Sequence, residues 1–161
     1  MTNIEAICQG KIKMLAGTYL AGADLSGANL AGGDLSGANL TGTNLAGANL
    51  QGAILRANLR GADLTGADLT GADFRNADLR GASFANAQVR EASFAGAFLA
   101  GSAIGNLDLS GVDLRGTDLR GANLAMAVLH QADLSNANLS GADLSGADLE
   151  EANLNGAVLR G

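Results

Sequence analysis

Proline and tryptophan are absent from the 161-residue chain, and aromatic residues make up only 3% of it. Apolar residues reach 47%, but most of them are Ala and Leu. A globular core of this length normally uses more large aromatic and β-branched side chains. We therefore expect one domain whose core is filled by many small side chains in a regular arrangement.

Cysteine and histidine each occur only once. Cys8 cannot form an intrachain disulfide, which favours a reducing compartment and the role of a small buried hydrophobic residue. The single His130 excludes a histidine pair for a metal ion, and no glycine-spaced stretch is followed by the lysine of a phosphate-binding loop. We therefore predict no catalytic residue, no metal ion and no cofactor, and expect a protein that is not an enzyme.

Long apolar runs and an excess of positive charge are also missing. No stretch approaches the roughly 20 apolar residues needed to cross a bilayer, and Glu5 stands where a secretory signal would begin its apolar run. Ten basic residues against 16 acidic ones give a net charge of −6, which speaks against direct nucleic-acid binding. We expect a cytoplasmic protein that contacts neither membranes nor nucleic acid directly.

A five-residue repeat covers nearly the whole chain. A large apolar residue marks the centre of each unit, every fifth residue from Leu15 to Leu55 and again from Leu59 to Leu159. Ala usually stands two residues before the centre, Asp or Asn one residue before it, and Gly two residues after it. Residues two apart point to the same side of an extended segment, and Gly suits a turn. The repeat predicts coils with Leu and Ala inside and Asp or Asn outside, stacked about 4.8 Å apart.

The tandem A(D/N)LXX pattern, as in residues 23–27 (ADLSG) and 62–66 (ADLTG), resembles the pentapeptide-repeat family. The resemblance covers residues 14–161. It implies an all-β fold, a right-handed quadrilateral parallel β-helix with four units in each coil. It also implies a bacterial source, with cyanobacteria particularly rich in such chains. Nine centres before the break and twenty-one after it make thirty units. These units correspond to about seven and a half coils and a rod roughly 35 Å long.

One residue is missing from the repeat near residues 53–58, because Leu55 and Leu59 are only four apart. Either Ile54 or Leu55 can therefore be the centre of its unit. A one-residue slip inverts side-chain facing, so we expect a distorted corner, either a tolerated deletion or a kink in a binding face. Residues 1–13 precede the pattern, and we expect them to cap the N-terminal edge of the solenoid formed by residues 14–161.

Residues 83–108 depart from the repeat, because other residues replace Asp or Asn before several centres. Leu107 and Val112 stand where Ala is usual. Phe98 takes an outward position, where a lone exposed apolar residue is ordinary but an aromatic ring can also anchor a partner. Three further phenylalanines occupy centres and are expected to replace Leu in the core: Phe74, Phe84 and Phe94.

Outward residues twenty apart are expected to stack on one face, which places Arg60, Arg80 and Arg120 in one column with Ala100 between them. Asp residues nearby would offset the repulsion between the arginines. The column is either a mixed-charge solvated surface or a stripe that docks an acidic partner. The candidate interaction surface consists of Phe98, Arg60, Arg80 and Arg120.

Two functions remain open at this stage. The first is a non-catalytic structural or protein-interaction solenoid with an unknown protein partner, because repeat solenoids work by presenting extended surfaces. The second is implied by the family resemblance alone: some members are similar to duplex DNA in size and negative charge and modulate DNA gyrase or topoisomerase. This chain lacks the C-terminal helical dimerisation module typical of those members, and its charge is mixed rather than phosphate-like.

The repeats continue to Gly161 without a C-terminal cap. Two molecules meeting end to end, a longer parent chain, and a frayed last coil would each account for this uncapped edge. Of the three we favour an end-to-end homodimer through the C-terminal coil.

Overall fold

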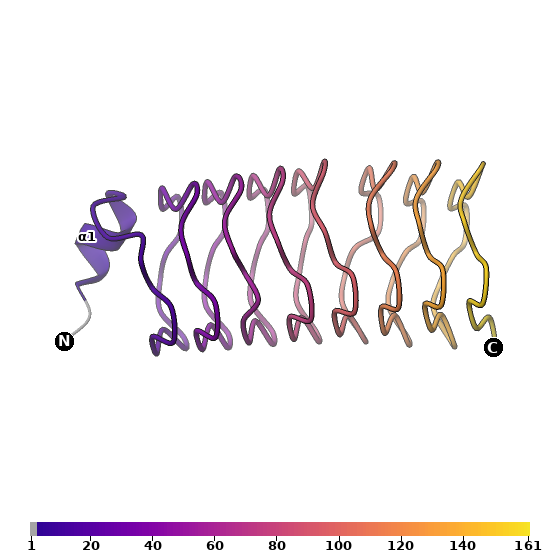
Figure 1. The fold of residues 1–161 in the computed structure, drawn as a ribbon, viewed down its shortest axis with the longest axis horizontal. Helices are drawn as coiled ribbons and strands as arrows, with labels where there is room; N and C mark the ends of the chain where they lie inside the picture. Colours follow the sequence, from indigo (N-terminus) through magenta and orange to yellow (C-terminus); the bar gives the residue numbers. More distant parts are fainter. Residues whose placement is uncertain (1–2) are drawn as a thin grey trace.

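The computed structural model describes residues 3–161, which form a rod of stacked coils with one short helix, α1 (Ile4–Cys8), at its N-terminal end (Figure 1). Parallel bridges join residues twenty apart, such as Met14 to Asp34 and Asp118 to Asn138. Each pairing is an isolated bridge between single residues, so no continuous strand is formed within residues 3–161. Helix α1 is the one regular element of that range. The predicted parallel β-helical solenoid is therefore confirmed.

The bridges fall into four columns, which we name faces 1 to 4 in chain order. Each face consists of the bridged residue, the outward residue two positions further on, and the corner residue after that. Faces 2 and 4 lie on opposite sides of each coil. The bridged residues of face 1 are Met14, Asp34, Ile54, Asp73, Ser93, Asp113, Asp133 and Asn153. Those of face 2 are Tyr19, Asn39, Asn58, Asp78, Phe98, Asp118, Asn138 and Val158. Those of face 3 are Asp24, Asn44, Asp63, Ser83, Ala103, Asn123 and Asp143. Those of face 4 are Asn29, Asn49, Asp68, Gln88, Asp108, Val128 and Asp148.

Nearly every corner is a hydrogen-bonded turn around a residue in the left-handed backbone region. The N–H of Ala28 donates to the carbonyl of Leu25 (3.1 Å), and Gly27 between them has a φ of 63°. Glycine adopts this φ without a steric penalty. Four corner residues that are neither Gly nor Asn adopt it as well, which costs of order 1–2 kcal/mol each. These residues are Glu91, Met126, Gln131 and Glu151.

The repeated Asp or Asn has a structural task beyond solubility. Its Oδ1 accepts a hydrogen bond from the backbone N–H two residues further on, as in Asp24 with Ser26 (3.1 Å) and Asn123 with Ala125 (3.0 Å). Such an Asx turn satisfies an N–H group that the hydrogen bonds between coils do not reach. A unit without Asp or Asn at this position therefore forgoes one hydrogen bond.

The interior of the rod is filled mainly by Leu and Ala, as predicted. Leu25 and Ala28 are fully buried, and Phe74, Phe84 and Phe94 are at most 3% exposed. The rings of Phe74 and Phe94 stack with their centroids 4.9 Å apart, while Phe84 meets both rings edge-on. The predicted core role of these three phenylalanines is confirmed, and their packing adds to simple burial.

The missing residue shortens one corner, at residues 55–58. Asn39 pairs with Asn58, nineteen residues away instead of twenty. Leu55 is fully buried and Ile54 is 37% exposed, so Leu55 is the centre of its unit. The N–H of Ala57 donates to the carbonyl of Leu55 (2.8 Å) in a three-residue turn that replaces the usual four-residue corner. The ladders before and after this corner stay intact.

Helix α1 covers the N-terminal edge of the first coil. Asn3 caps the helix by accepting a hydrogen bond from the N–H of Ala6 (3.0 Å). Ile7 is fully buried, and the carbonyl of Cys8 accepts a hydrogen bond from the N–H of Asn29 (3.1 Å), which extends the ladder onto the cap. Ile12, by contrast, lies largely at the surface. Within residues 3–161 no helix is long and apolar enough to cross a membrane.

Candidate interaction surface

Face 2 brings together the residues of the predicted interaction surface. Bridges join Asp78 to Phe98 and Phe98 to Asp118, so the ring lies between two aspartate-bearing units. Backbone hydrogen bonds from Gly61 to the Arg80 carbonyl and from Gly101 to the Arg120 carbonyl (both 3.0 Å) align the next outward positions. Those positions form a single column that contains Thr41, Arg60, Arg80, Ala100, Arg120, Ser140 and Arg160.

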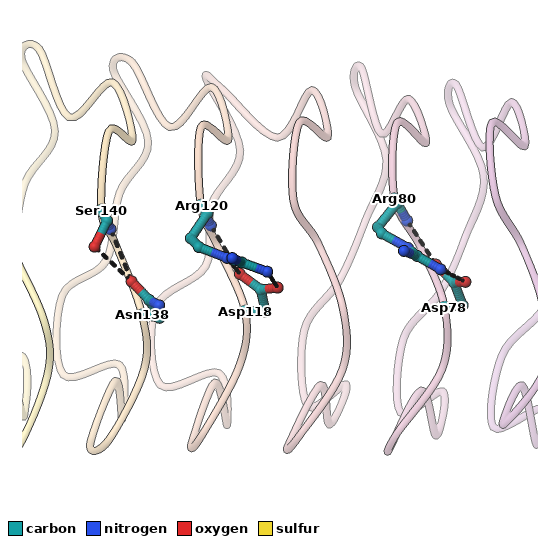
Figure 2. Close-up of polar contacts among 6 residues, drawn as sticks. All are labelled: Asp78, Arg80, Asp118, Arg120, Asn138 and Ser140. Carbon is teal, nitrogen blue, oxygen red and sulfur yellow. Dashed lines mark hydrogen bonds and ion pairs between the residues drawn. The ribbon is translucent and has the colours of Figure 1, made fainter.

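Arg80 and Arg120 are each held by the carboxylate of their own unit (Figure 2). The Nε atoms of Arg80 and Arg120 lie 2.8 Å from Oδ1 of Asp78 and of Asp118, respectively. A second bond joins Nη2 of each arginine to Oδ2 of the same aspartate. This two-pronged contact is the strongest geometry for an arginine–carboxylate pair, and it lays each guanidinium along the face with part of it exposed to solvent.

In the next coil Asn138 and Ser140 take the corresponding places. Oδ1 of Asn138 accepts hydrogen bonds from both the N–H (3.1 Å) and the Oγ–H (2.7 Å) of Ser140 (Figure 2). Asn and Asp thus make the same turn at this position, and only Asp adds a charge that holds an arginine. An Asp→Asn substitution on this face consequently removes the ion pair and keeps the cap.

The two arginines change the protonation of their partners. Hydrogen bonds from Arg80 hold the pKa of Asp78 below its ordinary value, and Arg120 does the same for Asp118. Both carboxylates are therefore charged at neutral pH, and each pair is neutral overall. Arg60 follows Asn58, which carries no charge, and is not among the arginines ion-paired within residues 3–161.

Phe98 is 48% exposed. Its ring occupies the position at which Asp or Asn would cap the N–H two residues further on, so Ala100 lacks that cap. A hydrogen bond of this kind contributes about 0.5–1.5 kcal/mol. The small side chain of Ala100 leaves the ring open between Arg80 and Arg120.

Tyr19 belongs to the same column of face 2 and is 73% exposed. Sequence reasoning did not single it out. The signal that would have found it is the one that marked Phe98: an aromatic residue at an outward position of the repeat.

Charge is divided unevenly among the four faces. Face 1 carries four Asp and three Arg, and face 2 carries two Asp and four Arg, which gives net charges of −1 and +2. Face 3 carries three Asp and no basic residue, and face 4 carries six acidic residues and Arg90, which gives −3 and −5. With +1 from residues 1–13 these values add up to the −6 of the chain. One side of the rod is therefore mixed in charge, and the other is acidic.

No part of the surface resembles a metal site in residues 3–161, because no three His, Cys, Asp or Glu side chains gather closely enough to hold an ion. His130 lies half-buried on face 4. The acidic residues of that face follow the repeat and are spread over successive coils.

The model of the pentapeptide-repeat family matches the chain over residues 18–56, 57–96, 92–136 and 122–161, with eight copies of the repeat. This match extends over most of the coils described above. The chain belongs to the pentapeptide-repeat family.

Solved structures with a similar fold include a trypsin-treated variant of QnrB1, a plasmid-mediated fluoroquinolone resistance protein. It is 23% identical, the match covers 90% of this chain and 84% of that chain, and the TM-score is 0.52. This likeness supports the right-handed β-helix and concerns the fold alone. No curated protein matches the chain.

Two cyanobacterial proteins are more similar in sequence. HetL of Nostoc sp. strain PCC 7120, a pentapeptide-repeat protein involved in heterocyst differentiation regulation, is 33% identical over 90% of this chain and 80% of that chain, with a TM-score of 0.37. Rfr23 of Cyanothece 51142 is 29% identical over 81% of this chain and 86% of that chain, with a TM-score of 0.39.

We expect acid to weaken the rod in part through Asp78 and Asp118. Because folding lowers their pKa values, their contribution to the free energy of unfolding is complete above the unfolded pKa of about 3.9 and is lost as the pH falls toward the folded pKa. The double variant Asp78→Asn, Asp118→Asn keeps both caps without the charges. Its Tm should therefore fall by a few degrees less than that of the wild type between about pH 5 and pH 2, as followed by circular dichroism. Equal falls in the two proteins would contradict this assignment.

Proposed function

We propose that the protein is a non-catalytic binding solenoid that contacts a protein partner through face 2. The observation that carries the proposal is Phe98, an exposed aromatic ring at a position where Asp or Asn would add a hydrogen bond to the fold. Arg80 and Arg120 flank the ring in the neighbouring coils. Aromatic and arginine side chains are the residues most enriched where binding energy concentrates.

The charge of face 2 indicates what the partner offers. The face has a net charge of +2 in a chain of −6. The guanidinium groups of Arg80 and Arg120 donate two bonds each to their aspartates through Nε and Nη2, which leaves further N–H donors of the five in each group. A partner surface that presents carboxylates around an apolar pocket satisfies both the donors and the ring. Binding of this kind needs no catalytic residue, metal ion or cofactor.

We expect Phe98→Asn to separate binding from folding. Asn restores the missing cap of Ala100, so the Tm should rise by about 1–4 °C. Loss of the ring should reduce partner capture by about tenfold or more. The measurement compares immobilised wild-type and variant protein in extract of the source cells, with the captured proteins quantified by mass spectrometry.

Val128→Asn is the matched control for this comparison. Val128 is 38% exposed, stands at the same position of its unit, and lies on face 4, the opposite side of the coil. The control should also raise the Tm, because it also restores a cap, and it should leave capture unchanged. If Phe98→Asn and Val128→Asn retain the same proteins to the same extent, face 2 is not the binding surface.

A second candidate function is supported by the acidic side of the rod: mimicry of DNA in a complex with DNA gyrase or topoisomerase. Faces 3 and 4 together carry a net charge of −8, from nine acidic residues and Arg90. B-DNA carries one negative charge per about 1.7 Å, or about 20 charges over a rod of roughly 35 Å. The sign of the charge favours this function, while the density of charge is less than half that of DNA.

A supercoiling assay with purified DNA gyrase tests this second function. If the acidic side occupies the DNA site, the protein should inhibit supercoiling at about micromolar concentration, and Asp108→Asn with Asp148→Asn should weaken inhibition by removing charge from face 4 while keeping the turn caps. No inhibition at concentrations well above this range would remove gyrase from consideration and leave the face 2 proposal untouched.

We also propose that two molecules associate end to end through the C-terminal coil. Leu144, Leu149 and Leu154 are only half-buried, and Leu159 is 56% exposed. A second copy would cover these side chains and the unpaired edge of the ladder. Sedimentation velocity should show a dimer that Leu159→Asp dissociates. Met14→Asp, at the opposite end, should leave the dimer intact, and a monomeric wild type would overturn the proposal.

A further inference from the structure

In the part of the chain that the structure describes, the ladder between coils is interrupted at one place, on face 4. Asp68 pairs with Gln88, and Asp108 pairs with Val128, but Gln88 and Asp108 do not pair with each other. In Figure 1 the coils are evenly spaced along one edge of the rod and separate along the other edge between the rose and the orange coils. At the same positions of other units, the backbone N–H groups donate to a backbone carbonyl. Within residues 3–161, six N–H groups around this opening have no such acceptor: those of Asn86, Val89, Glu91, Leu107, Asp108 and Asp113.

The opening coincides with two oversized side chains. Leu107 and Val112 stand at the inward position that Ala87 and Ala92 occupy one coil earlier. The missing bonds include those beside them, from Asp108 to the Ala87 carbonyl and from Asp113 to the Ala92 carbonyl. Leu107 is only 3% exposed, so its side chain lies inside the rod. Because protein interiors are closely packed, extra carbons at a position that fits Ala push the neighbouring coil away.

The interior beneath the opening is apolar and imperfectly filled. A cavity of about 10 Å³ lies among Phe84, Val89, Phe94 and Leu107. This volume is about the least that admits one water molecule, and an apolar lining of this kind offers water no hydrogen-bond partner. The interior between the two coils is therefore less completely filled here than a close-packed protein core.

The opposite side of the same coil is fully paired. The N–H of Phe98 donates to the Ala77 carbonyl (2.9 Å), its carbonyl accepts from the N–H of Leu79 (2.8 Å), and the N–H of Leu99 donates to the Asp118 carbonyl (2.7 Å). Phe98 lies midway between Gln88 and Asp108 along the chain, on face 2. The coil is thus held on face 2 and open on face 4.

We infer that residues 88–108 form a hinge, wedged open by Leu107, which divides the rod into an N-terminal and a C-terminal unit. In a solenoid each coil is stabilised by its neighbours, so a junction that lacks several hydrogen bonds is the weakest one and opens first. Because face 2 stays paired, opening the hinge bends the rod around Phe98 and changes the curvature of the surface between Arg80 and Arg120. The hinge does not depend on whether face 2 binds a partner.

Hydrogen exchange measured by NMR on the full chain tests the hinge. In the wild type the amides of Val89 and Asp108 should exchange at least about tenfold faster than those of Leu69 and Gln88, their equivalents one coil earlier, because only the latter pair with the neighbouring coil. Leu107→Ala should slow the exchange of Val89 and Asp108 toward that of Leu69 and Gln88. Its Tm should stay within about 2 °C of the wild type or rise, since the coils close onto Ala.

Leu109→Ala is the matched control, because Leu109 fills the centre of the same unit and is fully enclosed. This substitution leaves a cavity and should lower the Tm by about 5 °C or more without slowing exchange at Val89. The hinge is overturned if Val89 exchanges as slowly as Leu69 in the wild type. It is also overturned if Leu107→Ala lowers the Tm as much as Leu109→Ala does and leaves the exchange of Val89 fast.

Discussion

The hydrogen bonds between coils depend on an exact match of successive coils, because the donors find their acceptors in the preceding or the following coil, about twenty residues away along the chain. Coils of unequal length or thickness cannot all be paired. The one missing residue is therefore absorbed in the corner at residues 55–58, where the turn tightens and Leu55 stays buried. N–H groups that the ladder does not reach are satisfied within their own unit, as Asp24 does for Ser26. Most regular units thus combine hydrogen bonds to the adjacent coils with one cap formed within the unit.

Departures from this arrangement gather in one part of the rod. Between residues 83 and 103 the capping Asp or Asn is replaced in five successive units, and just after them Leu107 and Val112 overfill the interior. Proteins depart from the sequence preferences of their fold most often at functional sites. Phe98 and the opening at Asp108 are opposite sides of the same coil. Opening of the hinge therefore bends the rod at the exposed ring of Phe98, whatever partner is bound.

The uneven distribution of charge follows from where the arginines stand in the repeat, because most of them fall on faces 1 and 2. Residues two apart point to the same side, so an Arg placed two positions after Asp is neutralised within its own unit, as in Asp118 and Arg120. Faces 1 and 2 contain the five ion pairs found in residues 3–161. Faces 3 and 4 have almost no arginine and remain acidic. The rod therefore has two sides of mixed charge and two acidic sides.

The five-residue period by itself determined the inward Leu and Ala, the outward Asp or Asn, the glycine corners, the buried phenylalanines and the outward position of Phe98. These features are local, since each follows from the spacing of residues within one or two units. The choice of Leu55 over Ile54 and the one-sided opening at Leu107 were decided only by the tertiary structure. Both depend on how one coil fits against another, and that fit is a contact between residues about twenty apart whose outcome is set by the packing of the whole interior.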